Sequence, residues 1–231
     1  MLVVTGGTKG IGRAIIERFA AEGHAIATCA RKAADLDELK QSVEAKYKVN
    51  VYVQTADLSV KEDTQTFVDF VKRIGEPVDV LVNNTGVFLP GSIREEPDGN
   101  LEMMINTNLY SAYRITRAFV GEMMERKSGY IFNISSIAGF MAYANGGSYA
   151  ISKHAMQGFS KCLREEMKEY GVRVTSVQPG ATYTASWEGV DIPQERFSTP
   201  EDVAEMVWSA FNLSKRSVVE DIIIRPQLGD L

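Results

Sequence analysis

The sequence predicts an α/β protein in which a parallel sheet of about seven strands lies between two layers of helices. Short β-branched apolar runs alternate with longer amphipathic segments along all 231 residues, which is the pattern of βαβ units. Most of these runs are apolar on both faces, as expected of strands that helices cover on both sides. No linker, repeat or low-complexity tract interrupts the alternation. We therefore expect a three-layer, doubly wound single domain over residues 1–231.

Each element can be placed by its pattern. Strands are expected at Leu2–Thr5, Ala25–Ala30, Val49–Thr55, Val78–Val82, Gly129–Ile134, Val172–Gln178 and Asp221–Ile224. Helices are expected at Gly10–Ala21, Asp35–Tyr47, Val60–Ile74, Asn100–Arg126, Ser148–Tyr170 and Pro200–Leu213. Right-handed crossovers between these strands would bring their carboxyl ends to one edge, where such sheets bind ligands.

Composition excludes several classes of protein. The net charge is -5 with both signs mixed along the chain, so nucleic acid is not an expected partner. Cys29 and Cys162 lie far apart, and neither they nor His24 and His154 have metal-ligand or triad spacing. No apolar run approaches the roughly 20 residues that a bilayer requires. No basic, apolar leader precedes the first strand. We expect a cytoplasmic protein with no metal site and no membrane partner.

A glycine-rich turn joins the first strand to the first helix. Residues 5–12 read Thr-Gly-Gly-Thr-Lys-Gly-Ile-Gly, and the helix that follows carries Ile15, Ile16 and Phe19 on one face. Glycines let the backbone approach a phosphate closely, and the positive helix N-terminus favours an anion. Because strand, spacing and helix agree, the turn is interpreted as a phosphate-binding loop.

The T-G-x-x-x-G-x-G spacing of this loop resembles that of the short-chain dehydrogenase/reductase family. Residues 83–86 (Asn-Asn-Thr-Gly), 57–58 (Asp-Leu) and 179–184 (Pro-Gly-Ala-Thr-Tyr-Thr) match further family motifs, with Thr85 in place of the usual Ala. The resemblance covers nearly the whole chain and implies a Rossmann-type fold that binds a nicotinamide cofactor. The cofactor-binding residues it implies are Gly6, Thr8, Lys9, Gly10, Ile11, Gly12, Arg31, Asp57, Leu58, Asn83, Gly86, Tyr149, Lys153, Pro179, Gly180, Thr182 and Thr184.

The charges near the second strand indicate which nicotinamide cofactor is preferred. An acid at the end of this strand would accept the ribose hydroxyls, whereas a base would bind a 2′-phosphate. Here the strand is followed by Arg31 and Lys32, and Lys9 precedes Gly10, a pairing that resembles NADP(H)-preferring members of the family. Asp35 comes too late along the chain to replace them. We expect NADP(H) to be preferred over NAD(H).

Tyr149 and Lys153 are the candidate proton-transfer pair. Their i, i+4 spacing puts them on one helix face, with Cβ atoms roughly 5–6 Å apart. A phenol with a pKa near ~10 exchanges protons poorly at neutral pH, and a neighbouring ammonium favours the phenolate. Lowering that pKa by about three units would require about 4 kcal/mol, which calls for a water-poor cleft.

The resemblance adds Ser136 and Asn108 as catalytic residues. Ser136 lies thirteen residues before Tyr149, as in the family, and would bind the substrate carbonyl, with Ser135 as the competing assignment. Asn108 is favoured over Asn106 because Thr116 follows eight residues later, as in relatives. The implied role of this asparagine is to shape its helix and hold a water that passes protons towards the lysine.

These residues together predict NADPH-dependent, reversible reduction of a ketone or aldehyde to an alcohol. Two substrate classes stay open: a 3-oxoacyl group on an acyl-carrier protein, which residues 126–127 (Arg-Lys) could meet, and a small ketone or pterin. The sequence at residues 169–171 and 224–229 departs from the acyl-carrier type of reductase. A different class of function, an NADP(H)-binding sensor or subunit without turnover, is the alternative.

Two further surfaces can be proposed from the pattern. Residues 184–199 are expected to form a short substrate lid through Trp187, Ile192 and Phe197. The two long helices are expected to pair copies of the chain into a dimer or homotetramer, as is common in the family. The candidate contacts are Met103, Met104, Tyr113, Phe119, Phe159 and Leu163, some of which must face the sheet instead.

Overall fold

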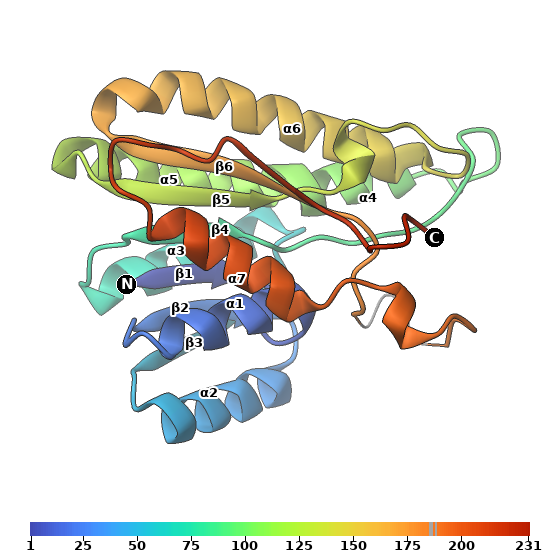
Figure 1. Ribbon diagram of the computed structural model, residues 1–231. Coiled ribbons are helices and arrows are strands. Elements are labelled where there is room, and N and C mark those ends of the chain that lie inside the picture. Colours follow the sequence, from blue (N-terminus) through green and yellow to red (C-terminus); the bar gives the residue numbers. More distant parts are fainter. Residues whose placement is uncertain (185–186, 188) are drawn as a thin grey trace.

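The computed structural model describes residues 1–184, 187 and 189–231 and confirms the predicted α/β architecture (Figure 1). The strands are β1 Leu2–Thr5, β2 Ile26–Ala30, β3 Val51–Thr55, β4 Val80–Asn83, β5 Gly129–Ile134, β6 Val172–Pro179 and β7 Asp221–Ile224. The main helices are α1 Gly10–Ala20, α2 Ala33–Tyr47, α3 Lys61–Ile74, α4 Asn100–Ile105, α5 Ser111–Arg126, α6 Gly147–Met167 and α7 Pro200–Phe211. Most predicted boundaries lie within two residues of these.

All seven strands are parallel and follow the order β3-β2-β1-β4-β5-β6-β7. The chain therefore winds outwards from β1 to β3, returns to the centre, and winds the other way from β4 to β7. The direction reverses between β1 and β4. A parallel sheet opens a crevice at such a reversal, beyond the carboxyl ends of the two strands, and this is where the functional residues gather.

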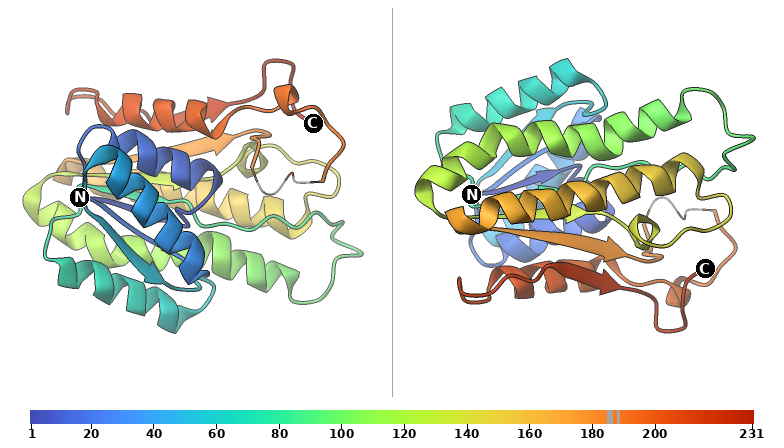
Figure 2. Two further views of the ribbon diagram at one scale, coloured as in Figure 1. Left: turned by 90° about the horizontal axis from the view of Figure 1, so that it is seen from below. Right: turned by 90° about the horizontal axis from the view of Figure 1, so that it is seen from above.

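Helices cover both faces of the sheet, as the two views of Figure 2 show. On one face α1, α2 and α7 pack against alternate strand residues such as Val4 and Phe132. On the other face α3, α5 and α6 pack against the intervening residues, such as Val3 and Ile131. These four side chains are completely buried, which explains why the strands show no polar face in the sequence.

The predicted helix Asn100–Arg126 is interrupted, and this is the main difference from the expected elements. Residues Asn106–Tyr110 form a π-helical turn between α4 and α5. A π turn inserts an extra residue into a helix and is frequent at functional sites. The apolar periodicity does not reveal it, because the chain continues as a helix on both sides.

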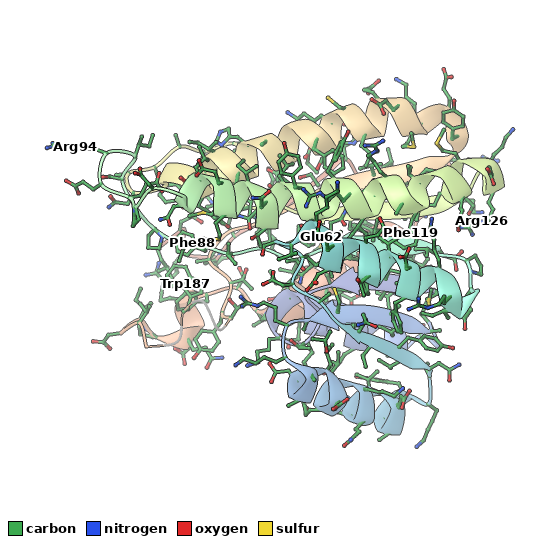
Figure 3. The ribbon with its side chains drawn as sticks, turned by 180° about the vertical axis from the view of Figure 1, so that it is seen from behind. Glu62, Phe88, Arg94, Phe119, Arg126 and Trp187 are labelled. Carbon is green, nitrogen blue, oxygen red and sulfur yellow. The ribbon has the colours of Figure 1, made fainter. Side chains whose placement is uncertain are left out.

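The residues proposed to pair copies of the chain separate into two groups. Met104 of α4 and Phe119 of α5 are buried within this chain, so neither is available to another copy; Figure 3 marks Phe119. Tyr113 is 40% exposed, and its ring packs against Phe159 with centroids 5.7 Å apart.

Within the described part of the chain, no helix is long and apolar enough to cross a membrane.

Candidate active site

The glycine loop is built in a way that only glycine permits. Gly6 and Gly10 have positive φ angles of +66° and +53°, which side chains disfavour. A Cβ on Gly7 would lie 2.3 Å from Ile16 Cδ1, and one on Gly12 would lie 2.5 Å from Asn84 Nδ2. Two glycines therefore set the turn, while the other two allow α1 to pack closely on the sheet.

Hydrogen bonds fasten this loop to the segment after β4. The Thr5 hydroxyl accepts from the backbone N–H groups of Asn84 and Thr85, each at 2.9 Å. The Asn84 amide donates to the carbonyls of Thr5 at 2.9 Å and Gly6 at 3.0 Å. The two walls of the crevice at the reversal point are thus one rigid unit. The sequence prediction did not assign Asn84 a role, although it lies inside a recognised motif.

A cleft of about 740 Å³ runs along the carboxyl edge of β1, β2 and β4. The predicted cofactor-binding residues in its lining are Gly6, Thr8, Lys9, Gly10, Ile11, Arg31, Asp57, Leu58, Gly86, Tyr149, Lys153 and Thr184. Asn84, Thr85, Val87, Met103 and Thr107 line it as well and were not predicted.

The other predicted cofactor-binding residues lie elsewhere. Asn83 is buried, and its amide donates to Thr116 Oγ1 at 2.9 Å and Asn133 Oδ1 at 2.8 Å, so it connects β4, β5 and α5. Gly12 is buried under the glycine loop. Pro179, Gly180 and Thr182 line a second, neighbouring pocket.

The cleft can accommodate a dinucleotide. Among the described residues, no side chain caps the first turn of α1, and that turn holds no acid, so its N–H groups can meet a phosphate. A Cβ on Gly10 would lie 2.9 Å from Thr184 Cγ2, so the bare glycine keeps the entrance open. These features fit the pyrophosphate that the sequence predicts.

Charges at the far end of the cleft differ from the prediction in one respect. Arg31 lies in the lining, as expected, and Lys9 Nζ is 3.7 Å from Asp35 Oδ2. Asp35 itself lines the cleft, so a carboxylate that was not expected there lies beside the two cations. Helix α2 begins at Ala33, and its first turn carries Asp35 back to the crevice.

Tyr149 and Lys153 stand side by side on α6. Lys153 is buried, with Nζ 5.7 Å from the centroid of the Tyr149 ring and 3.0 Å from the Ile134 carbonyl oxygen, to which it donates. Burial lowers the pKa of Lys153 to about 8, because the charged ammonium loses its water. Burial raises the pKa of Tyr149 to about 12, partly offset by a hydrogen bond with Ser136. The expected lowering of the phenol pKa by Lys153 is therefore wrong for the protein by itself, in which burial outweighs it and keeps the phenol protonated.

The two serine candidates have different surroundings. Ser136 is partly exposed, lines the same pocket as Tyr149 and accepts from the Ala138 N–H at 3.1 Å. The Ser135 hydroxyl is buried and donates to the Lys153 carbonyl at 3.4 Å. A partly exposed hydroxyl that lines the pocket beside the tyrosine suits carbonyl binding better than a buried one, so the geometry favours Ser136 over Ser135.

Asn108 lies within the π turn and is fully buried. Its Oδ1 accepts from Val87 N at 2.7 Å, and its Nδ2 donates to Val87 O at 3.0 Å and Ser152 Oγ at 2.9 Å. The extra residue of the π turn thus points an amide across to the loop after β4. Asn106 is partly exposed, and its side chain makes no hydrogen bond with the described residues.

A second pocket of about 460 Å³ opens beside the cleft. Its walls are mainly apolar and aromatic and include Phe88, Tyr143 and Trp187; Figure 3 marks Phe88 and Trp187 near the same end of the molecule. The Asp230 carboxylate also lines it and is paired with Arg225. The chain tail reaches this pocket because Gly180 leaves room: a Cβ there would lie 2.8 Å from Asp230 Oδ1.

The proposed lid lies partly in this wall. Residues 185, 186 and 188 are outside the described part of the chain. Thr182 forms an isolated bridge with Ser198, which closes the segment at its base. Trp187 packs on the buried Phe197 with ring centroids 5.0 Å apart and lines the pocket.

A glycine-rich loop at the reversal of a doubly wound sheet, together with a Ser-Tyr-Lys cluster, is the arrangement expected of a Rossmann-type oxidoreductase. The family model for short chain dehydrogenases matches residues 1–194, and the chain belongs to this family. A sepiapterin reductase of Chlorobaculum tepidum is 36% identical to this chain, in an alignment that covers 100% of this chain and 98% of the relative.

Solved structures show the same relationship. An alcohol dehydrogenase of Thermococcus sibiricus complexed with 5-hydroxy-NADP superposes with a TM-score of 0.91 at 26% identity, covering 100% of this chain and 98% of the other. A 3-oxoacyl-[acyl-carrier protein] reductase of Brucella melitensis superposes with a TM-score of 0.87 at 25% identity, covering 97% of this chain and 89% of the other.

Proposed function

We propose that this oxidoreductase reduces a ketone or aldehyde to an alcohol with NADPH, and that the reaction is reversible. One observation carries the proposal: Tyr149 lines both the cleft and the neighbouring pocket. Lys153 lines the cleft and Ser136 lines the pocket, one on each side of the tyrosine. A proton donor at the junction of a dinucleotide cleft and an apolar pocket suits hydride chemistry at a carbonyl.

The side chains divide the work as follows. Ser136 and the Tyr149 hydroxyl bind the carbonyl oxygen from the pocket side, which orients the carbonyl carbon towards the cleft. Bound NADPH would supply the hydride to that carbon. The Tyr149 phenol is protonated at neutral pH and donates its proton to the oxygen, but its raised pKa opposes that donation, so the phenolate left behind needs a stabilising charge. Lys153 stabilises the phenolate that remains, because its ammonium lies beside the ring.

Beside the role expected for it in shaping the helix and holding a water, Asn108 has a structural part. Both polar atoms of its side chain are engaged with Val87 and Ser152. Val87 lies in the cleft lining next to Phe88, which lines both cavities. We therefore assign Asn108 to holding this wall in place.

The cofactor proposal is NADP(H). Lys9 and Arg31 offer two cations to a 2′-phosphate at the far end of the cleft. The Thermococcus sibiricus relative was solved with an NADP derivative. Asp35 reduces the positive potential there, so the predicted preference over NAD(H) is moderate rather than absolute.

For the substrate we favour a pterin-type or similar small carbonyl compound over an acyl-carrier thioester. Trp187 and Phe88 provide aromatic walls, and the Asp230 carboxylate, although both of its oxygens accept from Arg225, has further lone pairs for the N–H groups of a heterocycle. Arg126, the expected carrier contact, donates to the Val78 carbonyl at 2.6 Å and pairs with Asp79 at 3.1 Å. Figure 3 shows Arg126 at the opposite end of the molecule from Phe88 and Trp187, which argues against carrier docking there.

A panel of carbonyl compounds assayed with NADPH tests this proposal. We expect turnover of a pterin that bears a side-chain ketone, and weaker turnover of a 3-oxoacyl thioester. Asp230→Asn should raise KM for the pterin about tenfold, since a charged hydrogen bond is lost, and should leave a simple aliphatic ketone unaffected. Equal effects on both substrates would contradict the assignment of Asp230.

A further inference from the structure

The loop between β4 and α4, residues 84–99, crosses the beginning of α6. The Gly91 N–H donates to the Asn145 carbonyl at 3.0 Å. Further along the loop, Glu96 accepts from the Ser148 N–H with Oε1 at 3.2 Å and Oε2 at 3.4 Å. The loop is therefore attached to the segment before α6 and to its first turn.

Glu96 supplies what α6 lacks. The first N–H groups of a helix have no partner within it, and they carry a partial positive charge. The N-cap of α6 is Gly146, which cannot offer a side-chain acceptor, and the first turn contains no acid. A carboxylate 52 positions earlier in the chain fills both needs.

The fit between loop and helix is close. Gly147 has a φ of +36°, and a Cβ there would lie 2.4 Å from the Gly91 carbonyl oxygen and 3.1 Å from Glu96 Oε1. Only glycine at this position lets the loop lie against the helix. The contact is thus part of how α6 begins, directly before Ser148 and Tyr149.

The same loop carries a residue that touches the tyrosine. The Phe88 ring meets the Tyr149 ring edge to face with centroids 4.7 Å apart. Besides the Gly91 contact at Gly147, the loop therefore meets α6 through two side chains: Phe88 packs on Tyr149, and Glu96 accepts from the backbone N–H of Ser148. Loss of the Glu96 contact would release the loop and, with it, the Phe88 wall of the substrate pocket.

We propose that Glu96 is a positioning residue, which fixes the loop of residues 84–99 on α6 and so sets Phe88 against Tyr149 at the substrate pocket. This inference rests on the proposed carbonyl reduction only for its kinetic consequences. Glu96 lines neither cavity, and the cleft-lining start of the loop is held separately by bonds from Asn84 to Thr5 and from Val87 to Asn108, so loss of Glu96 should affect the carbonyl substrate far more than the cofactor.

Three variants test the proposal by steady-state kinetics. Glu96→Ala should lower kcat/KM for the carbonyl about tenfold, mainly through KM, with an unchanged Kd for NADPH. Glu96→Gln keeps a carbonyl oxygen for the Ser148 N–H and should stay within about threefold of the wild type. The matched control is Glu95→Ala, because the exposed Glu95 side chain makes no hydrogen bond with any described residue. Equal kinetics for Glu96→Ala and Glu95→Ala would overturn the proposal, as would an equal loss of NADPH affinity.

Amide hydrogen exchange gives a readout that needs no turnover. In Glu96→Ala the Ser148 amide and the segment of residues 84–99 should exchange at least about tenfold faster, while the core strands keep their protection. Unchanged exchange at these sites would refute the anchoring role whatever the kinetics show. If Glu96→Ala exchanges faster at these sites but the wild type reduces no carbonyl, the anchoring role stands and the proposed function is refuted.

Discussion

Lys153→Met should make the protein more stable at pH 7, although it removes a residue central to the proposed chemistry. Lys153 is buried, and its pKa falls from 10.5 to about 8 on folding. A pKa depression of this size means that the charged lysine lowers the free energy of unfolding by about 3 kcal/mol. Methionine of similar length removes that cost and loses the hydrogen bond to the Ile134 carbonyl, worth about 1 kcal/mol. The expected net gain is about 2 kcal/mol.

The gain should depend on pH in a defined direction. Because the folded pKa lies below the unfolded one, the unfolded chain binds more protons between about pH 8 and pH 10.5, and wild-type stability rises with pH across this window. The cost of the charge is fully present below pH 8 and is mostly lost by pH 10. The advantage of Lys153→Met should therefore fall from about 2 kcal/mol at pH 7 to about zero at pH 10.

Urea unfolding of the wild type and the variant at both pH values measures this difference. Lys161→Met is the matched control, since Lys161 is exposed on the same helix and should change stability little at either pH. A Lys153→Met protein that is less stable than the wild type at pH 7 would refute the reasoning. So would a gain of the same size at both pH values, because it would not come from the buried charge.

Three other changes have clear expected outcomes. Asp35→Asn should tighten NADPH binding about threefold and NADH binding less, since Lys9 is freed for the phosphate. Fluorescence titration measures the two dissociation constants. The control is Asp37→Asn, because Asp37 is exposed and outside the cleft lining and its loss should change neither constant. Gly7→Ala should destabilise the protein by about 1 to 3 kcal/mol, seen as a lower urea midpoint, because the added Cβ would overpack against Ile16 of α1 and Thr28 of β2. Asn108→Ala should lower Tm and raise KM for the carbonyl, because a buried amide that holds the loop after β4 is lost.

The sequence was most informative where function depends on neighbours in the chain. The glycine loop and the Tyr149–Lys153 pair are local patterns, and a strand, a turn or a helix suffices to place them. These parts of the site were predictable because the backbone alone determines their geometry.

The parts that could not be predicted depend on contacts distant in the chain. Glu96 meets Ser148 across 52 residues, and Asp230 reaches the pocket only because the tail folds back over Gly180. The π turn at Asn108 holds one extra residue, and hydrogen bonds from Asn108 to the loop after β4 stabilise it. Neither feature changes the apolar periodicity of the sequence. Such contacts are set by packing, and one sequence does not encode them as a pattern.

Transfer of label from the cofactor tests the central claim most directly. NADPH carrying deuterium at the transferable position should be incubated with the wild type and a pterin ketone, and the alcohol product examined by mass spectrometry. We predict one deuterium on the carbinol carbon with the wild type, and none with Tyr149→Phe at matched cofactor occupancy. Binding of NADPH without label transfer to any carbonyl compound would contradict the account and identify a cofactor-binding protein without turnover.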